Sequence, residues 1–359
     1  MKKILCLIDR LSFGGAERQL MGLALLLKQN GYDVEMATYH DFDFRTDDLE
    51  ANNVRLHRIS QKGNPLSKLF AVRSLINKQK YDVVIAYKSG VTMLACLLKM
   101  MGGQFRLIVS ERNTTQVLTK REKLKFWLYR RADYVVPNSY SQEAFIKNHY
   151  PTLGKKTVAI TNFTDTEHFS PAGSAVNQVP VMLTVGRVAK QKNVLAYLEA
   201  VRMVKEKGVD VRFLWYGNSQ KGEDEYARQC KEAVMALGIA DVFEFHPATS
   251  HILSVYQQCD IFCLPSLYEG FPNVLCEAMG CGKPVVCSRV CDNERIVNEG
   301  ENGLLFNPQN VDDIAEKLER MMQMPKDQME QWGRRSRELA EERFSEESFV
   351  NQYISLIES

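Results

Sequence analysis

The stretch PSLYEGFPNVLCEAM, residues 265–279, carries two carboxylates, Glu269 and Glu277, eight positions apart. A Gly and a Pro follow the first carboxylate and predict a tight turn. Residues 273–279 are helix formers, and the glycines at 280 and 282 predict the end of that helix. A helix is therefore expected to begin between the two carboxylates.

The predicted helix start is suited to bind an anion. The first N–H groups of a helix lack partners within it, so they form a site for a phosphate. Glu269 would lie in the turn, and Glu277 about one helical turn inside. The ribose and hexose of a nucleotide sugar supply hydroxyl donors for such carboxylates, at roughly 1.5–3 kcal/mol per charged hydrogen bond. The stretch therefore predicts a sugar-nucleotide site.

Apolar, strand-like segments alternate with amphipathic helical segments along the whole chain. The predicted strands are residues 4–8, 33–37, 83–86, 106–109 and 134–136, then 181–185, 211–216, 242–245, 261–264 and 284–287. The predicted helices are residues 17–29, 92–101 and 141–148, then 194–207, 226–237, 252–258, 273–279 and 311–322, with a charged helical tail after 325. This alternation predicts an α/β fold with two Rossmann-like, doubly wound halves joined by a hinge at residues 162–180.

The charge is divided unevenly between these halves. Residues 1–170 contain 26 Lys and Arg against 16 Asp and Glu, whereas the remainder contains 20 against 28, so a net +10 and a net −8 give the overall +2. The first half is therefore expected to meet an anionic surface, for which membrane and nucleic acid both qualify. The nine cysteines are odd in number and lie mostly in apolar runs, which favours a reducing cytoplasm. We expect neither a secretory signal nor a membrane-spanning segment.

Four motifs, in register along the chain, resemble those of the retaining GT-B glycosyltransferases of family GT4. They are residues 265–288, Gly14-Gly15-Ala16-Glu17-Arg18, Gly186-Arg187 with Gln191-Lys192-Asn193, and residues 165–171. The resemblance implies two Rossmann-like domains facing a central cleft, at residues 1–170 for the acceptor and 171–338 for the donor. It also implies that a last helix, residues 339–359, crosses back to the first domain.

The resemblance assigns roles to individual residues. Arg187 and Lys192 would stabilise the leaving diphosphate, and with Glu269 they are the expected catalytic residues. The expected donor-binding residues are Gly15, Arg187, Lys192, Glu269, Gly270, Phe271, Asn273, Val274 and Glu277. Because the two cations take the place of a divalent metal, no metal or other cofactor is expected. Asp41-Phe42-Asp43 has the form of a metal-binding pair, but it lies away from the donor motifs and is expected on the surface.

The first half departs from the family pattern at one position. Many members have a His in the loop after the strand that corresponds to 106–109, whereas this chain has Ser110-Glu111-Arg112-Asn113. Gly14, Glu111, Arg112 and Asn113 are the candidates for binding acceptor or phosphate. The alternative, that Glu111 and Arg112 pair with each other, stays open. This form resembles members that extend lipid-linked glycans.

Two basic stretches in the first half, residues 66–80 and 120–131, mix cations with large apolar residues. Each basic residue near an anionic leaflet gains roughly 1 kcal/mol, and Trp can enter the headgroup region. The expected membrane contacts are Lys120, Arg121, Lys123, Lys125 and Trp127. The alternative is that each stretch is an ordinary amphipathic helix packed on its own sheet. Nucleic acid is not expected as a partner, because no recognised module for it is present.

Together these features predict a cytoplasmic enzyme at the inner membrane face. It would transfer a hexose or N-acetylhexosamine from a nucleotide diphosphate, with UDP expected, to a lipid-linked or surface-polysaccharide acceptor. The alternatives are a sugar-nucleotide epimerase or phosphorylase of the same fold, and a nucleotide-sugar binding protein without catalysis.

Overall fold

A computed structural model describes the chain except for residues 13, 41–45, 60–64, 116, 174–176 and 221. The chain forms two compact units: unit 1 comprises Met1–Phe163 with Glu346–Ser359, and unit 2 comprises Thr164–Ser345. The sequence placed these divisions at 170 and 338. The difference arises because residues 165–169 and the whole of α13 (Lys326–Phe344) pack within unit 2. Asp41 and Asp43 lie outside the described residues.

Unit 1 contains a six-stranded parallel sheet in the order β3-β2-β1-β4-β5-β6. Its strands are β1 (Lys3–Leu7), β2 (Asp33–Thr38), β3 (Arg55–Arg58), β4 (Val83–Tyr87), β5 (Arg106–Glu111) and β6 (Tyr134–Pro137). Alternate residues of the strands enter two separate cores: Ile4 and Cys6 belong to one, and Leu5 and Leu7 to the other. Burial on both faces explains why β1 is a continuous apolar run.

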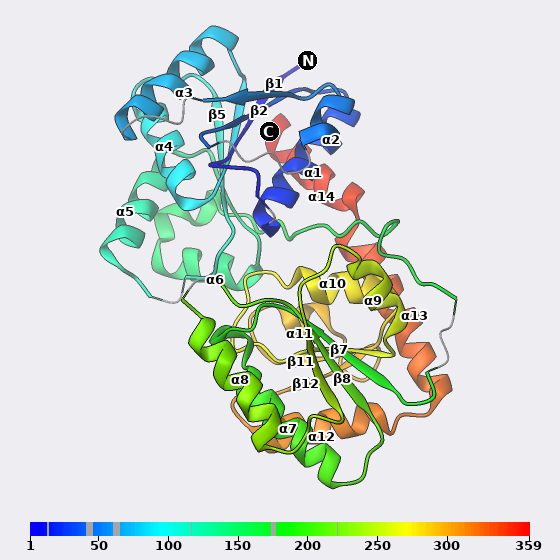
Figure 1. Ribbon diagram of the computed structural model, residues 1–359. Helices are drawn as coiled ribbons and strands as arrows, with labels where there is room; N and C mark the ends of the chain where they lie inside the picture. The colour runs from blue at the N-terminus through cyan, green and yellow to red at the C-terminus, as the bar shows by residue number, and fades with distance from the viewer. Residues whose placement is uncertain (13, 41–45, 60–64, 116, 174–176, 221) are drawn as a thin grey trace. The chain divides into compact units, whose positions relative to one another are not determined.

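Helices cover both faces of this sheet. Over one face lie α1 (Gly15–Gln29), α2 (Thr46–Ala51) and α14 (Glu346–Glu358), and over the other lie α3 (Pro65–Gln79), α4 (Ser89–Met100), α5 (Lys120–Leu128) and α6 (Tyr140–His149). The C-terminal helix α14 packs beside α1 (Figure 1) through Phe349, Tyr353 and Ile357. The last segment of the chain thus completes the core of unit 1.

Unit 2 repeats the same arrangement with the order β12-β11-β10-β7-β8-β9. Its strands are β7 (Val181–Val185), β8 (Arg212–Tyr216), β9 (Phe243–His246), β10 (Ile261–Leu264), β11 (Val285–Ser288) and β12 (Gly303–Phe306). One face is covered by α7 (Val194–Glu206), α8 (Asp224–Ala236) and α12 (Val311–Met322), and the other by α9 (Ile252–Gln258), α10 (Asn273–Gly280), α11 (Asn293–Ile296) and the end of α13 (Figure 1). The predicted fold class, two Rossmann-like halves, is confirmed.

Two strands, β3 and β12, were not predicted from the sequence, and both lie at a sheet edge. The four residues of β3 are Arg55, Leu56, His57 and Arg58, none of them fully buried, so they have little hydrophobic signal. The strand β12 is buried but has only four residues, and it follows a turn that contains Gly300. The predicted helix inside the opening stretch is confirmed as α10, which ends where Gly282 adopts φ +70 and the Lys283 N–H returns to the Ala278 carbonyl at 3.1 Å.

The strand order creates a special position in each sheet. In unit 2 the chain leaves β7 toward β8 on one side and later returns to β10 on the other, so the loops after β7 and β10 diverge at the carboxyl edge. Ligands of open α/β sheets bind at such a point. The equivalent position of unit 1 lies between β1 and β4.

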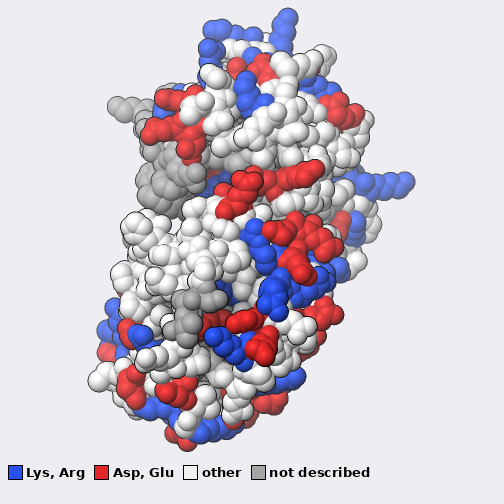
Figure 2. All heavy atoms as spheres, turned by 90° about the vertical axis from the view of Figure 1, so that its right-hand side faces the viewer, with Lys and Arg blue, Asp and Glu red and all other residues white. Residues whose placement is uncertain are grey.

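The surface carries both signs of charge, with basic and acidic side chains next to one another on the face that Figure 2 shows. Within the described part of the chain, we find no helix that combines the length and the apolar character needed to cross a bilayer.

Candidate active site

Two loops at the carboxyl edge of unit 2 are held together by hydrogen bonds. The Leu267 N–H donates to the Gln191 carbonyl at 2.8 Å, and the Gln191 side-chain amide donates to the Tyr268 carbonyl at 2.9 Å. One loop follows β7 and the other follows β10, so the two segments that the sequence singled out meet at the switch point.

A buried ion pair joins the same loops. The Lys192 ammonium lies 2.5 Å from Glu269 Oε1, and the side chains are 11% and 8% exposed. The Ser266 hydroxyl donates to the same carboxylate oxygen at 2.5 Å. Two charge-assisted hydrogen bonds thus fix Glu269 in one orientation. Ser266 lies within the quoted stretch, but its role was missed because a Ser in a loop has no distinguishing pattern.

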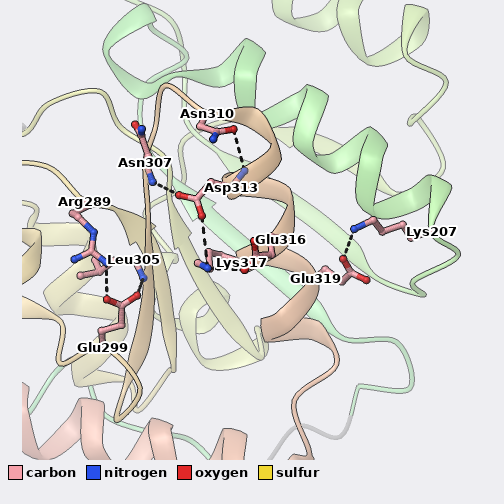
Figure 3. Close-up of polar contacts among 10 residues, drawn as sticks. All are labelled: Lys207, Arg289, Glu299, Leu305, Asn307, Asn310, Asp313, Glu316, Lys317 and Glu319. Atoms are coloured by element: carbon pink, nitrogen blue, oxygen red, sulfur yellow. Dashed lines mark hydrogen bonds and ion pairs between the residues drawn. The ribbon is translucent and has the colours of Figure 1, made fainter.

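The residue next to Lys192, Asn193, contacts the turn that follows β12. Asn193 adopts the left-handed conformation, φ 57 and ψ 37, which Asn tolerates better than most residues, and its side-chain amide donates to the Pro308 carbonyl at 2.8 Å. In this turn the Asn310 side chain caps α12 by accepting hydrogen bonds from the Asp312 and Asp313 N–H groups. Figure 3 shows the contact between Asn310 and Asp313. The residue that follows Lys192 is therefore tied to the turn after β12.

Arg187 has a different environment, because its side chain is exposed to solvent. Its guanidinium donates to Gln220 Oε1 at 2.6 Å and to Gln191 Oε1 at 3.1 Å. Neutral amides hold it in place without neutralising its charge. The preceding Gly186 is crossed closely by Gly217, where a Cβ would lie 2.0 Å from the Gly186 carbonyl oxygen, so only Gly fits at 217.

The second carboxylate of the opening stretch is also held firmly. Glu277 is 6% exposed and accepts a hydrogen bond from the Tyr256 hydroxyl at 2.9 Å. At the start of α10, Phe271 is buried, whereas Gly270, Asn273 and Val274 are half-buried. The Asn273 N–H donates a hydrogen bond to the Phe271 carbonyl at 3.1 Å. This N–H group, which was expected to bind the donor, therefore already has a partner inside the loop.

A third loop, after β11, reaches the site through Cys291. Its thiol accepts a hydrogen bond from the Glu269 N–H at 3.4 Å, and its backbone has φ 50. Burial raises the pKa of the Cys291 thiol, so the sulfur stays protonated and neutral beside the carboxylate. The loops after β7, β10 and β11 thus converge on Glu269.

Comparison with known families agrees with this geometry. Residues 165–339 match the family described as "Glycosyl transferases group 1", and residues 13–168 match "Glycosyltransferase Family 4". Together the two matches cover nearly the whole chain. The chain is a GT-B glycosyltransferase of family GT4. Both descriptions name glycosyl transfer, which favours it over the epimerase, phosphorylase and binding-protein alternatives.

Several characterised proteins are similar to this glycosyltransferase. The GalNAc-α-(1→4)-GalNAc-α-(1→3)-diNAcBac-PP-undecaprenol α-1,4-N-acetyl-D-galactosaminyltransferase of Campylobacter jejuni is 26% identical, over 89% of this chain and 88% of that protein. The UDP-Gal:α-D-GlcNAc-diphosphoundecaprenol α-1,3-galactosyltransferase of Escherichia coli is 26% identical, over 71% and 70%. The crystal structure of Anabaena Alr3699/HepE in complex with UDP has the same fold, with a TM-score of 0.87, 20% identity and 99% coverage of each chain.

The remaining predicted site residues of this glycosyltransferase lie in unit 1. Gly15 opens α1 and Gly14 precedes it, so both stand at the switch point of their own sheet. A Cβ on Gly14 would lie 2.4 Å from Glu17 Oε2, so a side chain there would displace that carboxylate. Glu17, which the sequence only quoted as part of the motif, is 3% exposed.

Glu111 and Lys125 occupy positions other than those expected. Lys125 was predicted to face a membrane, but it is 3% exposed and its ammonium lies 2.6 Å from Glu111 Oε2, with Glu122 as a second partner. Glu111 is 2% exposed and also accepts from the Tyr129 hydroxyl. The membrane assignment of Lys125 is therefore wrong, because its position on α5 points into the core. Burial raises the pKa of the Glu111 carboxyl, while Lys125 lowers it.

Arg112 turns away from Glu111. Its guanidinium donates to Asn162 Oδ1 and Ser110 Oγ, and it lies 4.6 Å from the centre of the Tyr87 ring. The suggested pairing of Glu111 with Arg112 is thus replaced by separate partners for each. Asn113 is exposed after β5. Lys120, Arg121, Lys123 and Trp127 are exposed on α5, and their contact with a membrane stays a prediction.

Proposed function

We propose that this glycosyltransferase transfers a hexose or N-acetylhexosamine from a UDP-sugar, with retention of configuration and without a divalent metal, to a polyprenyl-diphosphate-linked glycan. The observation that carries the proposal is the Lys192–Glu269 pair beside the exposed Arg187, at the switch point of unit 2. A cation and a hydroxyl-binding carboxylate adjacent to each other match the two ends of a sugar-diphosphate bond.

The cations account for departure of the diphosphate. When the glycosidic bond breaks, negative charge grows on the leaving phosphate oxygens, and fixed donors at that position lower the barrier. Among the described residues, the partners of the Arg187 guanidinium are neutral amides, and its planar shape suits bidentate binding of phosphate. Lys192, braced by the loop and by Asn193, would supply the second contact.

The carboxylates account for recognition of the two sugars. Glu269, oriented by Lys192 and Ser266, would accept hydrogen bonds from hexose hydroxyls, and its charge would favour an oxocarbenium-like transition state at the adjacent carbon. Glu277, oriented by Tyr256 on α10, would accept from the ribose hydroxyls. The acceptor hydroxyl would attack from the side of the leaving group, with a phosphate oxygen taking its proton.

Ligand-induced thermal stabilisation tests the donor assignment. A ligand at about 100 times its dissociation constant adds roughly 2.7 kcal/mol to the free energy of unfolding, so the preferred base will give the largest rise in Tm. We expect UDP to exceed GDP and ADP, and Glu277→Gln to reduce the UDP response while Glu244→Gln, an exposed carboxylate of β9, leaves it unchanged. An equal response to all three nucleotides would contradict the base assignment.

Product analysis tests the stereochemistry and the metal requirement. With a panel of α-linked UDP-sugars and an undecaprenyl-diphosphate-linked N-acetylhexosamine as acceptor, the anomeric coupling constant of the product is expected to report an α linkage. EDTA is expected to leave the rate unchanged. A β-linked product would contradict retention, and a rate restored only by Mg²⁺ or Mn²⁺ would contradict metal independence.

The acceptor proposal includes peripheral contact with an anionic membrane through unit 1. We define the outer patch as the exposed apolar residues Leu66, Phe70, Leu97, Met100, Val117, Leu124 and Trp127, together with Lys120, Arg121 and Lys123. The helices α3, α4 and α5 cover the same sheet face, and α4 packs against both others. Apolar side chains bordered by cations suit a headgroup region. Two relatives act on undecaprenol-diphosphate substrates by name, which favours a lipid surface.

Vesicle sedimentation tests the outer patch. The test uses vesicles in which about one third of the lipid is phosphatidylglycerol. We expect the triple variant Lys120→Glu, Arg121→Glu and Lys123→Glu to bind them at least tenfold more weakly than the wild type, since each cation contributes about 1 kcal/mol. The control reverses three exposed cations of unit 2, Lys207, Arg228 and Lys231, and so makes the same change in net charge. Equal binding by both variants would contradict the assignment of this surface.

A further inference from the structure

The peptide group that joins Tyr268 to Glu269 is bonded on both sides to loops from different strands. Its carbonyl accepts a hydrogen bond from the Gln191 side-chain amide at 2.9 Å, and its N–H donates to the Cys291 sulfur at 3.4 Å. Gln191 lies in the loop after β7, and Cys291 lies in the loop after β11. These two strands flank β10, the strand that leads to Glu269. The loops on either side of β10 therefore hold one peptide group between them.

A peptide group that is held in this way restricts the side chain that follows it. The peptide is planar and trans, so its C=O and N–H point in opposite directions, and two hydrogen bonds resist rotation of the whole plane. Fixing the plane fixes the direction in which the Glu269 Cα leaves it. The carboxylate itself is already bonded to Lys192 and Ser266. Such precision matters, because a displacement of about 1 Å in a reacting geometry costs roughly 10²-fold in rate.

The backbone of Cys291 has a conformation that favours Gly. Cys291 has φ 50, and Asp292 after it has φ −94 and ψ 2. The Asn293 N–H donates to the Val290 carbonyl at 3.1 Å, so these residues match a type II′ turn, whose first central position favours Gly. The buried Asn293 side chain ties the turn to the Ser288 carbonyl at 2.8 Å. A thiol is thus present where Gly would be less strained.

The thiol is a neutral, weakly polar acceptor beside a carboxylate. Eight of the nine cysteines are buried, and Cys291 is the half-buried one. Burial raises the pKa of its thiol, so at neutral pH the sulfur adds no second negative charge next to Glu269. Sulfur accepts hydrogen bonds only weakly, so it does not compete with the carboxylate for sugar hydroxyls.

Gln191, on the other side of the peptide group, links the carboxylate loop to the exposed cation. Its side-chain oxygen accepts from the Arg187 guanidinium at 3.1 Å, while its side-chain nitrogen donates to the Tyr268 carbonyl. Its backbone carbonyl also accepts from the Leu267 N–H at 2.8 Å. One amide thus orients groups on both loops.

We infer that Gln191 and Cys291 are positioning residues, which clamp the Tyr268–Glu269 peptide group and so set the direction of the Glu269 carboxylate. The inference rests on the proposed function, because it takes Glu269 as the group that contacts the transferred sugar. In this role both residues act through Glu269 and not through contact with the diphosphate.

Transfer kinetics with the full chain test the clamp. The donors are UDP-glucose, UDP-galactose, UDP-GlcNAc and UDP-GalNAc, and the acceptor is an undecaprenyl-diphosphate-linked N-acetylhexosamine. With the donor that the wild type uses fastest, Cys291→Ala and Cys291→Gly should lower the donor kcat/KM about fivefold to tenfold, as the loss of one hydrogen bond implies. Cys291→Ser retains an acceptor and should recover most of the rate. The Kd of UDP, which lacks the sugar, should change by less than about twofold in calorimetry.

Double variants show whether the clamp acts through Glu269. In a Glu269→Gln background, Cys291→Ala should lower kcat/KM by less than about twofold, because the carboxylate that it positions is already absent. Gln191→Leu should cost more than Cys291→Ala in the wild-type background, about 10²-fold, because it also releases Arg187. Losses that multiply in the Cys291→Ala, Glu269→Gln double variant would overturn the inference.

The controls separate positioning from folding. Asn53→Gly relieves a similar backbone in unit 1, φ 55, and should leave kcat/KM unchanged. Cys291→Gly should unfold at no lower urea concentration than the wild type, since relief of the positive φ offsets the lost hydrogen bond; a lower urea midpoint would indicate a folding defect and overturn the positioning role. A slow Glu269→Gln with Cys291→Ala at the wild-type rate would overturn the inference alone. Wild-type kcat/KM in Glu269→Gln would instead overturn the proposed function, and the inference with it.

Discussion

Two buried Lys–Glu pairs, Lys192–Glu269 in unit 2 and Lys125–Glu111 in unit 1, are nearly identical in length, at 2.5 Å and 2.6 Å. In each, the carboxylate lies at or just beyond the carboxyl end of a parallel strand. Their surroundings differ. Glu111 ends β5, which lies between β4 and β6 and away from the switch point, and its pair is enclosed by Tyr129 and Glu122. Glu269 follows β10 at the switch point, beside an exposed Arg187.

The two pairs are thus distinguished by their place in the sheet and by an exposed neighbour, more than by their own geometry. The pair in unit 1 is enclosed and serves the core. The pair in unit 2 lies at the switch point, where open α/β sheets bind their ligands. Four experiments test this contrast.

Lys125→Met is expected to have the largest effect. It leaves the Glu111 charge buried without its cation, which typically costs about 3–5 kcal/mol of unfolding free energy. Urea denaturation measures the loss. Adding Glu111→Leu is expected to recover most of it, since Tyr129 retains its hydrogen bond with Thr92 at 2.9 Å. A double variant as unstable as the single one would contradict a purely structural role for the pair.

Glu269→Gln is expected to affect the rate more than stability. An amide keeps an acceptor oxygen for Ser266 and Lys192, but the charge near the reacting carbon is lost, so kcat should fall by about 10²–10³-fold. Transfer assays at saturating donor measure the rate, and UDP calorimetry serves as the control for an intact donor site. A variant with wild-type kcat would remove Glu269 from the mechanism.

Arg187→Ala isolates the exposed cation. Because this side chain is solvated, its loss should change the unfolding free energy by no more than about 0.5 kcal/mol, while kcat falls by about 10²-fold. Arg212→Ala, an exposed cation on β8 of the same unit, is the matched control and should retain full activity. If both variants behaved alike, Arg187 would be an ordinary surface charge.

The pH dependence of stability gives the smallest effect and separates two buried carboxylates by sign. Burial raises the pKa of Glu111 above its usual 4.5, so the folded state binds a proton more readily and stability falls as the pH rises through that raised pKa. For Glu35, burial raises the pKa, but hydrogen bonds from Tyr81, His57 and Lys3 outweigh it and lower the pKa below 4.5. Its contribution is therefore present above pH 4.5 and lost as the pH falls through the lowered value.

Urea titrations at several pH values between about 3 and 7 measure how the free energy of unfolding changes with pH. Each carboxyl changes the unfolding free energy by at most about 1.4 kcal/mol per pH unit. Glu111→Gln should remove a negative slope, and Glu35→Gln a positive one. Slopes of the same sign would show that the surroundings of one carboxyl differ from those described.

The sequence predicts best those helices and strands that have a clear local pattern. The helix α10 was predicted from its formers and its terminal glycines, and the central strands from their apolar runs. The resemblance placed Lys192 and Glu269 at one donor site, and the structure brings the two side chains together because they follow β7 and β10, adjacent strands of one parallel sheet. By contrast, β3 and β12 lie at the edges, where little hydrophobic signal or length is required.

A local pattern does not reveal whether a given charged side chain of a helix is buried or exposed. Lys125 stands among exposed Lys120, Arg121 and Lys123, yet it alone of these four points inward, because it packs with Phe126 against the buried end of β5. Lys88, which follows β4, also forms ion pairs that no local pattern predicts. Its partners Asp9 and Glu17 are more than seventy positions away in sequence.

The two Rossmann-like halves follow from the sequence because strand and helix periodicity are local properties, and the family follows from motifs that are themselves short and local. The tertiary structure alone decided which charges are enclosed, which stay exposed and which meet across strands. Burial and pairing depend on residues far apart in the chain, and only the folded arrangement of strands brings them together.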